Sequence, residues 1–576
     1  MKRRGARNAE MDADRFRLRS RIVVVGLLAV ACVLGARAVQ LQVLDQQFLA
    51  KQGDMRYTRV AKIPAHRGAI VDRFGEPVAV SSPVDTVYVN PQELAQAPDE
   101  IPRLAKALKR DPQWLAQRVT SNLDRQFLYV ARHMDPAEAA RVRALGVPGT
   151  YLMREYRRYY PNGEVTGHVL GFTNLDDVGQ EGLELAFDQS LAGIDGRKRV
   201  IQDGRGRIIE NVESISAPRP GEVLELSLDL RIQYLAYREL KAAVRRHRAR
   251  AGSVIVLDVH TGEVLAMVNQ PSFNPNDRAQ YEVARYRNRA VTDIIEPGSS
   301  IKPFVLAAAL DSGRYRPDTV VDTSPGLVRV GVKTIQDKHN LGAVNLTTIL
   351  ARSSNVGMAK IALSLEREQL HRVLQGLGFG AVTTSGFPGE SAGLLSGASH
   401  WRPIGVATLS YGYGMSVTPL QLAQAYATIG SLGLRRPVTF RKVAAEVPGE
   451  RVLDEAVARQ LIGLLESVVT PDGTGLKAAV PGYRVAGKTG TAWKAVGGGY
   501  STDKYLAVFA GLAPASRPRL ATVVLIDEPG GAQYYGGDVA APVFSSVVSG
   551  ALRLLGVAPD EMSGVAPATT LVQAQP

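Results

Sequence analysis

The stretch that decides the fold is Glu296-Pro297-Gly298-Ser299-Ser300-Ile301-Lys302-Pro303-Phe304, followed by an apolar run over residues 305–310. Pro297-Gly298 breaks the chain, and the apolar run is a strong helix former, so a helix is predicted to begin near Ser299. Lys302 then lies one turn along on the same face. A serine hydroxyl needs a base to become a good nucleophile, and a buried lysine with a lowered pKa is such a base. Free amides at the helix start can stabilise an oxyanion.

The Ser-x-x-Lys pattern alone is weak, because a chain of 576 residues carries it by chance. Ser501-Thr502-Asp503-Lys504 is a second copy. It follows a glycine run, which predicts a loop, and no helical pattern follows it. We therefore take Ser299 and Lys302 as the functional pair, although Ser299 taken alone is equally well explained as a helix cap.

The second motif is Ser353-Ser354-Asn355, which follows a helical pattern over residues 346–351. The Ser353 hydroxyl can relay a proton, and the Asn355 amide can hold a peptide substrate. A similar triplet, Ser272-Phe273-Asn274, lies in a loop rich in Pro and Asn. For either triplet alone, a turn or a helix cap is the structural alternative.

The third motif is Lys488-Thr489-Gly490-Thr491, within a predicted edge strand. Lys488 offers a positive field, and the hydroxyls of Thr489 and Thr491 can receive a carboxylate. Gly490 lets a substrate approach the backbone closely. The structural alternative is an exposed strand lysine beside a turn glycine. Three motifs in this order are far more specific than any one of them, and together they are the signature of penicillin-binding proteins and class A β-lactamases.

Strand patterns lie on both sides of these motifs, and helical patterns lie between them. The predicted strands are residues 222–228, the hairpin 253–259 with 264–268, and residues 505–510 and 521–526. This arrangement predicts an α/β domain over residues 222–562 whose sheet joins distant segments. Residues 45–221 predict a separate mixed α+β domain that ends at a Pro- and Gly-rich break, and residues 563–576 predict a disordered tail.

The N-terminal region predicts a membrane anchor. Residues 1–21 are basic, and residues 22–36 are apolar or small. A helix continued to residue 44 reaches the roughly 20 residues that a bilayer core needs, with Arg37 at the outer interface. A cleavable signal peptide ending at Ala36-Arg37-Ala38 is the alternative. The basic flank then stays cytoplasmic and the remaining chain lies outside the inner membrane.

The rest of the composition limits the function classes. The net charge of +14 suits an anionic partner, but no nucleic-acid-binding signature accompanies it. Cys32 is the one cysteine, which excludes an intrachain disulfide. It predicts a small buried thiol, with a lipoprotein cleavage site as the alternative. The histidines show no metal-ligand spacing, so no metal site is predicted.

Beyond the three motifs, the chain resembles the class B penicillin-binding proteins from residue 22 to about 560. The N-terminal motifs of that class are similar to Arg67-Gly68-Ala69-Ile70-Val71-Asp72-Arg73, Arg158-Tyr159-Tyr160-Pro161, Gly167-His168 and Gly182-Leu183-Glu184. The division-specific septal transpeptidases, the penicillin-binding protein 3 family, are similar at residues 226–231, 411–419, 486–494 and 534–537. The resemblance implies an anchor helix, a non-catalytic pedestal domain, and a transpeptidase domain with a central antiparallel sheet flanked by helices.

The resemblance also implies a mechanism. Ser299 attacks the bond between two terminal D-alanines of a stem peptide, with Lys302 as base and Ser353 as proton relay near Lys488. Asn355 holds the donor peptide, Thr489 and Thr491 receive its carboxylate, and the amides of Ser299 and Thr491 form the oxyanion hole. β-Lactams acylate the same serine. No metal or organic cofactor is implied.

The implied partners are peptidoglycan, the membrane, a glycosyltransferase and other division proteins at the septum, with no nucleic acid. Three alternatives stay open. The elongation-specific transpeptidase is the nearest rival within the class. A penicillin-sensing receptor would use the same domain for binding alone, and a divisome scaffold would have lost catalysis.

Overall fold

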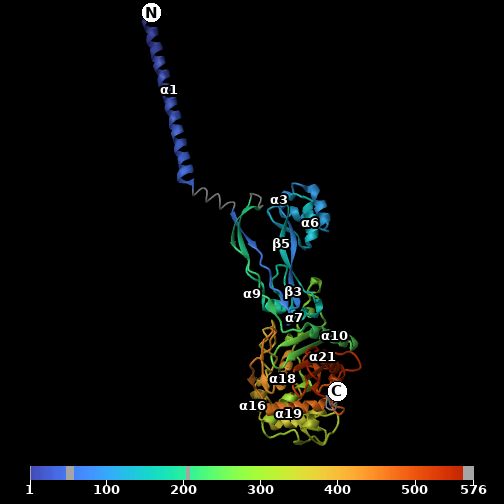
Figure 1. Ribbon diagram of the computed structural model, residues 1–576. Coiled ribbons are helices and arrows are strands. Elements are labelled where there is room, and N and C mark those ends of the chain that lie inside the picture. Colours follow the sequence, from blue (N-terminus) through green and yellow to red (C-terminus); the bar gives the residue numbers. More distant parts are fainter. Residues whose placement is uncertain (1, 47–57, 203–207, 562–576) are drawn as a thin grey trace, which may run out of the picture. The chain divides into compact units, whose positions relative to one another are not determined.

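A computed structural model describes residues 2–46, 58–202 and 208–561 (Figure 1). The described chain forms two compact units. The small unit comprises Met1–Ala65, Asp85–Met153 and Ile194–Arg219, and the large unit comprises His66–Val84, Arg154–Gly193 and Pro220–Pro576. Two segments of the predicted pedestal, residues 66–84 and 154–193, thus belong to the same compact unit as the three motifs. The predicted tail, residues 563–576, lies outside the described residues.

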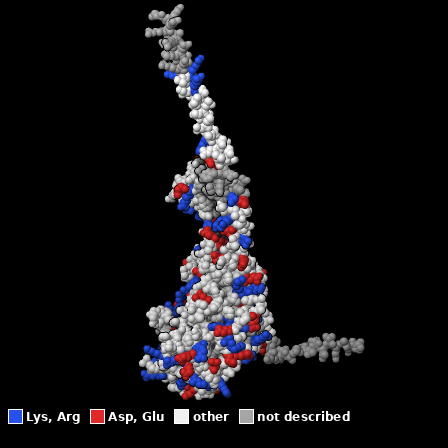
Figure 2. Space-filling view, turned by 90° about the vertical axis from the view of Figure 1, so that its left-hand side faces the viewer, with Lys and Arg blue, Asp and Glu red and all other residues white. Residues whose placement is uncertain are grey.

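The small unit begins with α1 (Lys2–Val39) and the π-helix η1 (Gln40–Leu44). Among the described residues, Arg17–Leu44 is the one helical segment that is long and apolar enough to cross a membrane. Figure 2 shows an uncharged stretch of this helix with basic residues at both ends. The expectation of a buried Cys32 thiol is wrong for this chain, because Cys32 is exposed on a helix whose apolar part is not covered.

The rest of the small unit contains two β-layers and a helical cluster. β1 (Thr58–Ile63), β6 (Gly196–Gln202) and β7 (Ile208–Ser216) form an antiparallel sheet. β3 (Pro77–Val89) pairs with β4 (Leu128–Met134) and β5 (Thr150–Tyr159). Apolar side chains of β3 and β4 pack with the helices α3 (Pro91–Leu94), η2 (Pro98–Glu100), α4 (Ile101–Ala107), α5 (Pro112–Thr120) and α6 (Pro136–Ala144). The prediction of mixed helices and strands in this part of the chain is thus confirmed.

In the large unit, a buried charge cluster joins three of the four N-terminal motifs. The Glu184 carboxylate lies between the guanidinium groups of Arg67, at 2.8 Å, and Arg158, at 2.6 Å. All three side chains are buried. Removing one partner of such a cluster leaves an uncompensated buried charge, which costs about 3–5 kcal/mol. These residues are therefore structural: they hold the segments around β2 (Ile70–Val71), α8 (Gly182–Ala186) and the end of β5 together.

The large unit is organised by a five-stranded antiparallel sheet in the order β10-β9-β19-β18-β17. The strands are β9 (Ala251–Asp258), β10 (Val264–Gln270), β17 (Ala486–Val496), β18 (Gly499–Ala513) and β19 (Leu520–Asp527). The predicted hairpin and the joining of distant segments are confirmed, because β9 pairs with β19 from Ala251↔Asp527 to Asp258↔Leu520. The strand predicted at 222–228 shrinks to β8 (Leu224–Glu225), which pairs in parallel with β2.

Helices cover both faces of this sheet, so it is buried between two apolar cores. On one face lie α10 (Leu230–Arg246), capped by Asp229 as predicted, and α21 (Ala541–Leu554). On the other face lie α13 (Lys302–Asp311), α18 (Pro419–Gly430) and α19 (Glu455–Glu466). Figure 1 shows these helices around the sheet. The strand β17 at the sheet's edge is left free on one side.

The remaining elements of the large unit are short and connect the sheet to these helices. They are η3 (Gly163–Val165), α7 (Gly167–Leu170), α9 (Asp188–Leu191), η4 (Arg278–Gln280), α11 (Val283–Tyr286), α12 (Arg289–Thr292), η5 (Gly298–Ile301), β11 (Val320–Asp322), β12 (Leu327–Val330), β13 (Lys333–Gln336), β14 (Ala343–Asn345), α14 (Leu346–Ala351), α15 (Asn355–Ser364), α16 (Arg367–Gly376), η6 (Ala398–His400), α17 (Pro403–Leu409), β15 (Leu434–Arg435), β16 (Glu450–Arg451), η7 (Ser467–Val469), η8 (Leu476–Ala478) and α20 (Gly536–Val539).

Candidate active site

Ser299 lies in the 3-10 turn η5, directly before α13, so the predicted position near a helix start is confirmed. Hydrogen bonds on both sides fix this turn. The Ser300 hydroxyl donates to the Pro297 carbonyl at 2.7 Å, and the buried Tyr426 hydroxyl donates to the Ser300 carbonyl at 3.0 Å. The helix that follows is buried through almost its whole length. Ser299 is thus presented on a rigid turn, as a precisely placed nucleophile requires.

Lys302 brings the first and second motifs together. Its side chain is fully buried, and its Nζ donates to the Ser353 carbonyl at 2.6 Å, the Ser353 Oγ at 3.1 Å and the Asn355 Oδ1 at 2.8 Å. Three acceptors match the three protons of an ammonium group. In the neutral amine one of these positions becomes a lone pair, which can accept a proton from a serine hydroxyl.

The pKa of Lys302 is lowered well below its usual value. Burial is the main cause, because the charged form loses its hydration, and the positive charge of Lys488 lowers the pKa further. The Asp337 carboxylate opposes both effects and raises this pKa. The net shift favours the neutral amine over the ammonium form, and the neutral amine is the form that a general base needs.

The second motif is held by a residue outside it, Asp337. Its Oδ2 accepts from the Ser354 hydroxyl at 2.5 Å, and its Oδ1 accepts from the amides of Asn355 at 2.5 Å and Val356 at 3.1 Å. Ser354 caps α15 by accepting from the Gly357 amide at 2.9 Å. The carboxylate therefore satisfies free amides at the N-terminus of α15, where negative charge is also favoured.

This anchoring sets the orientation of Ser353, the residue just before the cap. Its backbone has φ +59°, a left-handed conformation that costs energy for a residue with a side chain. Asp337 was not among the predicted site residues. It follows β13 and lies 17 residues before Ser354, and no periodicity of the sequence links Asp337 to Ser354. The one feature of the sequence that could have indicated this role is that Asp337 is an acidic residue a short distance before the helical pattern at 346–351.

The third motif lies on β17, and its prediction as an edge strand is confirmed. Successive side chains alternate between the two faces of a strand. Lys488 is fully buried, so the structural alternative of an exposed strand lysine is excluded. Its Nζ lies 3.1 Å from the Thr489 carbonyl and 3.2 Å from the Thr489 Oγ1, and burial lowers its pKa to about 7.

Gly490 has a packing role that the sequence did not indicate. A Cβ at this position would lie 3.0 Å from the Pro297 carbonyl oxygen and 3.4 Å from the Ser300 Cβ. The absence of a side chain therefore lets β17 lie directly against the turn that carries Ser299. The expected role of Gly490 in admitting substrate stays a prediction.

A cavity of about 800 Å³ opens over the three motifs. Ser299, Ser353, Asn355, Thr489 and Thr491 line it, whereas Lys302 and Lys488 lie beneath its wall. Residues from distant segments complete the lining: Gln336, Asp337, Lys338, His339, Leu341, Arg352, Ser354, Gly473, Thr474, Leu476, Lys477, Tyr535, Gly537 and Asp538. Its basic residues suit an anionic peptide substrate. Most of these lining residues could not be predicted from the sequence, because they belong to no motif.

The rejected copy of the first motif is confirmed as unsuitable. Ser501 and Lys504 lie on β18, a strand and not the predicted loop. Gly497 and Gly498 both have positive φ and form the two-residue turn of the β17–β18 hairpin. The Ser501 hydroxyl donates to Asp503 at 2.5 Å, and Lys504 is 3.6 Å from Glu528. This lysine is exposed to solvent and lies beside a carboxylate, so it lacks the buried surroundings of Lys302.

The fold and the site are those of an acyl-transferase with the Ser-x-x-Lys motif, in which a buried lysine lies beneath a peptide-sized cleft. Residues 252–549 match the family described as "Penicillin binding protein transpeptidase domain", and residues 62–226 match "Penicillin-binding Protein dimerisation domain". The chain is 44% identical over 542 residues to the peptidoglycan D,D-transpeptidase FtsI of Escherichia coli (strain K12), covering 93% of this chain and 92% of that protein. The protein belongs to the class B penicillin-binding proteins.

Two solved structures agree with this membership. The apo transpeptidase domain of penicillin-binding protein 3 from Burkholderia pseudomallei is 44% identical, with a TM-score of 0.54, and covers 58% of this chain and 97% of that chain. Penicillin-binding protein 3 from Mycobacterium tuberculosis, complexed with aztreonam, is 28% identical with a TM-score of 0.68, covering 87% of this chain and 98% of that chain. The second match extends over both predicted extracytoplasmic domains.

Proposed function

We infer that the protein is a septal peptidoglycan D,D-transpeptidase that works through an acyl-enzyme on Ser299. The observation that carries this proposal is the contact of the buried, low-pKa Lys302 with Ser353 and Asn355, which line the same cavity as Ser299. The identity to a peptidoglycan D,D-transpeptidase of a second bacterium over nearly the whole chain supports the same reaction and the same septal role.

Acylation proceeds in two proton-coupled stages. Lys302 takes the proton of Ser299, whose Oγ attacks the carbonyl carbon between the two terminal D-alanines of a donor stem peptide. The backbone amides of Ser299 and Thr491 stabilise the oxyanion that forms. The C–N bond then breaks, and the departing nitrogen receives the proton from Lys302 through the Ser353 hydroxyl. Free D-alanine leaves, and an ester on Ser299 remains.

Transfer reverses these proton movements. The amine of a neighbouring stem peptide attacks the ester carbonyl and gives up its proton through Ser353 to Lys302. The Ser299–acyl bond breaks, and Ser299 regains its proton. Asn355 holds the donor backbone, while Thr489 and Thr491 bind the terminal carboxylate beside Lys488. Gly490, which has no side chain, lets the substrate approach the backbone closely. A β-lactam follows only the first stage, because its ring nitrogen stays attached to the acyl group.

The organisation of the chain follows from this function. Residues 1–21 form a short basic cytoplasmic segment, residues 22–44 the membrane anchor, residues 45–221 the pedestal and residues 222–562 the transpeptidase domain. Basic residues before the anchor favour a cytoplasmic N-terminus and a periplasmic catalytic domain. We propose that a glycosyltransferase that polymerises the glycan and other division proteins are its partners at the septum.

The experiment that tests the site is covalent labelling with a fluorescent penicillin, followed by peptide mass spectrometry. The expected result is a stable adduct on Ser299 that is absent from Ser299→Ala. Ser501→Ala is the matched control, because it removes the serine of the second Ser-x-x-Lys copy and should label normally. An adduct on Ser501, or none on a folded protein, would refute the assignment and favour a scaffold.

A further inference from the structure

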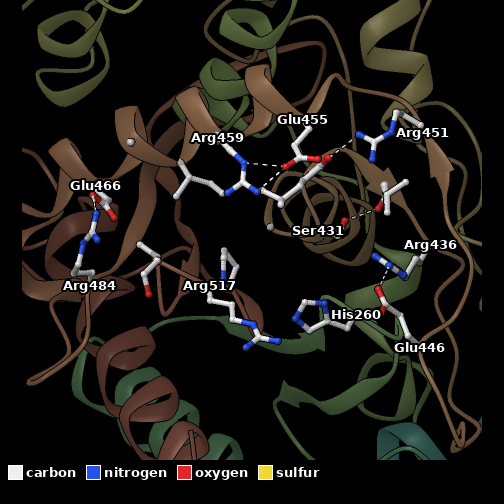
Figure 3. A pocket seen from close by; sticks show the side chains of 18 residues that line it. His260, Ser431, Arg436, Glu446, Arg451, Glu455, Arg459, Glu466, Arg484 and Arg517 are labelled. Atoms are coloured by element: carbon white, nitrogen blue, oxygen red, sulfur yellow. Dashed lines mark hydrogen bonds and ion pairs between the residues drawn. The ribbon is translucent and has the colours of Figure 1, made fainter. Parts of the chain in front are cut away.

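A second cavity, of about 660 Å³, lies in the large unit, and it shares no lining residue with the catalytic cleft. Its walls are the C-terminal end of α18 with the turn after it, β15, β16, α19 and the turn between β18 and β19. Figure 3 shows side chains from these elements arranged around an open centre. The volume is in the range of pockets that bind small molecules or short peptides.

The lining of this cavity is rich in charge of both signs, with an excess of two positive charges. The arginines are Arg436, Arg451, Arg459, Arg484 and Arg517, and the glutamates are Glu446, Glu455 and Glu466. His260 also lines the cavity. Burial, the largest effect, lowers the pKa of His260, which disfavours a positive charge on this ring.

Three of the arginines are paired with the glutamates of the wall. Arg436 pairs with Glu446, Arg484 lies 2.8 Å from Glu466, and Arg459 lies 2.6 Å from Glu455 one turn earlier on α19. The last pair is exposed on both sides, so a competing carboxylate can take its arginine at little cost.

The other two arginines have no carboxylate partner among the described residues. Arg451 donates only to the backbone carbonyls of Leu432 and Leu453. Arg517 forms neither an ion pair nor a side-chain hydrogen bond within the described chain, and Figure 3 shows its guanidinium directed into the open centre beside His260. Arg517 therefore offers five unused donors to a ligand.

The spacing of these charges indicates the chemistry of the ligand. A single phosphate is best bound by donors that converge on one point, whereas these guanidinium groups stand around the rim with carboxylates between them. Apolar side chains of Leu432, Leu434, Ile462 and Pro518 contribute the rest of the lining. A short peptide with several carboxylates, an ammonium group and small apolar side chains matches this mixed surface.

We propose that this cavity binds the carboxylates of a peptidoglycan stem peptide, as a second substrate-binding site apart from the catalytic cleft. This inference rests on the proposed function, which makes such peptides the protein's substrate. A polymer carries many stem peptides, so holding one of them raises the effective concentration of its neighbours near Ser299. The cavity would then lower KM for polymeric substrate and leave the chemical step unchanged.

The test is a binding measurement on the full-length protein in detergent, with Ser299 first acylated by penicillin so that the catalytic cleft is filled. The probe is the tripeptide L-Ala-γ-D-Glu-diaminopimelate, which lacks the terminal D-alanines, and the method is titration calorimetry. Binding is expected to wild type and to weaken at least about tenfold in Arg517→Glu and in Arg459→Glu. The control Arg372→Glu alters an exposed arginine of α16 outside the cavity and should bind normally.

The two variants must also be acylated by penicillin at the wild-type rate, which establishes that they are folded. Failure of the tripeptide to bind wild type, or equal binding by Arg517→Glu, Arg459→Glu and wild type, would overturn the proposal. Binding of inorganic phosphate alone, with the same arginine dependence, would overturn it too and assign another anion. Acylation of Ser299 is measured in the same samples, so the proposed function is tested separately and stands if only the tripeptide fails.

Discussion

Asp337 provides the sharpest test of how the site is assembled, because it lies outside the three motifs but holds the second one. Its carboxylate accepts three hydrogen bonds, from Ser354, Asn355 and Val356, at the start of α15. A hydrogen bond to a charged group contributes about 1.5–3 kcal/mol, and a neutral one about 0.5–1.5 kcal/mol. Asp337→Asn keeps the shape and should lose about 1 kcal/mol per bond, or roughly 2–3 kcal/mol in all.

Asp337→Ala removes the carboxylate that accepts all three hydrogen bonds, and it should also release the Ser353 backbone from its left-handed conformation. A displacement of about 1 Å in a catalytic group can cost about 100-fold in rate. We therefore expect acylation by penicillin to slow about 10-fold in Asp337→Asn and about 100-fold in Asp337→Ala. Stopped-flow measurement with a fluorescent penicillin gives these rates, and thermal unfolding shows whether each variant is folded.

The pH profile separates this positioning role from a loss of stability. Asp337 raises the pKa of Lys302, so removing its charge should lower that pKa further. The acidic limb of the acylation profile should then move to lower pH in Asp337→Asn. Asp472→Asn is the matched control, because Asp472 is 86% exposed and pairs only with Arg352. Wild-type acylation rates in Asp337→Ala would refute the reasoning.

Four further changes have defined outcomes. Lys302→Arg and Lys302→Ala should both reduce penicillin labelling about 10²–10⁴-fold, because a guanidinium cannot give up its proton; labelling of the Arg variant at the wild-type rate would exclude Lys302 as the base. Gly490→Ala should lose about 1–3 kcal/mol of stability in thermal unfolding and acylate more slowly, since its Cβ would meet a carbonyl oxygen at 3.0 Å. Glu184→Gln should destabilise the large unit by about 3–5 kcal/mol, because the buried Arg158 loses its carboxylate partner and Arg67 keeps only Asp188, and calorimetry would show an unchanged melting temperature if this is wrong. Lys488→Met should flatten the pH dependence of stability. In wild type the unfolded chain holds the Lys488 proton up to its usual pKa, and the folded protein releases it near pH 7, so Lys488 makes stability rise with pH between these values by about 1.4 kcal/mol per pH unit. Lys302, whose pKa is also lowered, contributes a rise in both proteins, so denaturant titrations at pH 8 and 9.5 should show a rise that is smaller in Lys488→Met by the Lys488 increment.

The sequence predicted those parts of the site that depend on neighbouring residues. Ser299 and Lys302 share one helical turn, and Lys488 to Thr491 share one strand, so their relative positions follow from local geometry. The error at Ser501 was also local. The glycine run before it was interpreted as a loop, whereas two glycines with positive φ form a tight hairpin turn and let the strand continue.

What the sequence could not predict depends on contacts between distant segments. Asp337 reaches α15 across the intervening β14 and α14, and Thr474 bonds to Thr489 at 2.8 Å from a loop after α19. The burial of Lys488 follows from packing of the edge strand, because a single strand pattern does not say which face is covered. Each compact unit is made of several separate segments of the chain, again because its boundaries depend on contacts between distant segments.

The two buried lysines, Lys302 and Lys488, influence each other's protonation. Both have lowered pKa values because both lose hydration, but their neighbours differ and so do the effects of these neighbours on each pKa. Lys488 titrates near neutral pH, and whenever it is charged it pushes the pKa of Lys302 still lower. A pair of titratable groups whose pKa values are driven apart in this way has distinct roles. In the proposed mechanism Lys302 is the base, whereas Lys488 is the residue that a substrate carboxylate at Thr489 would keep charged. Binding of the substrate would thus reinforce the neutral state of the base that attacks it.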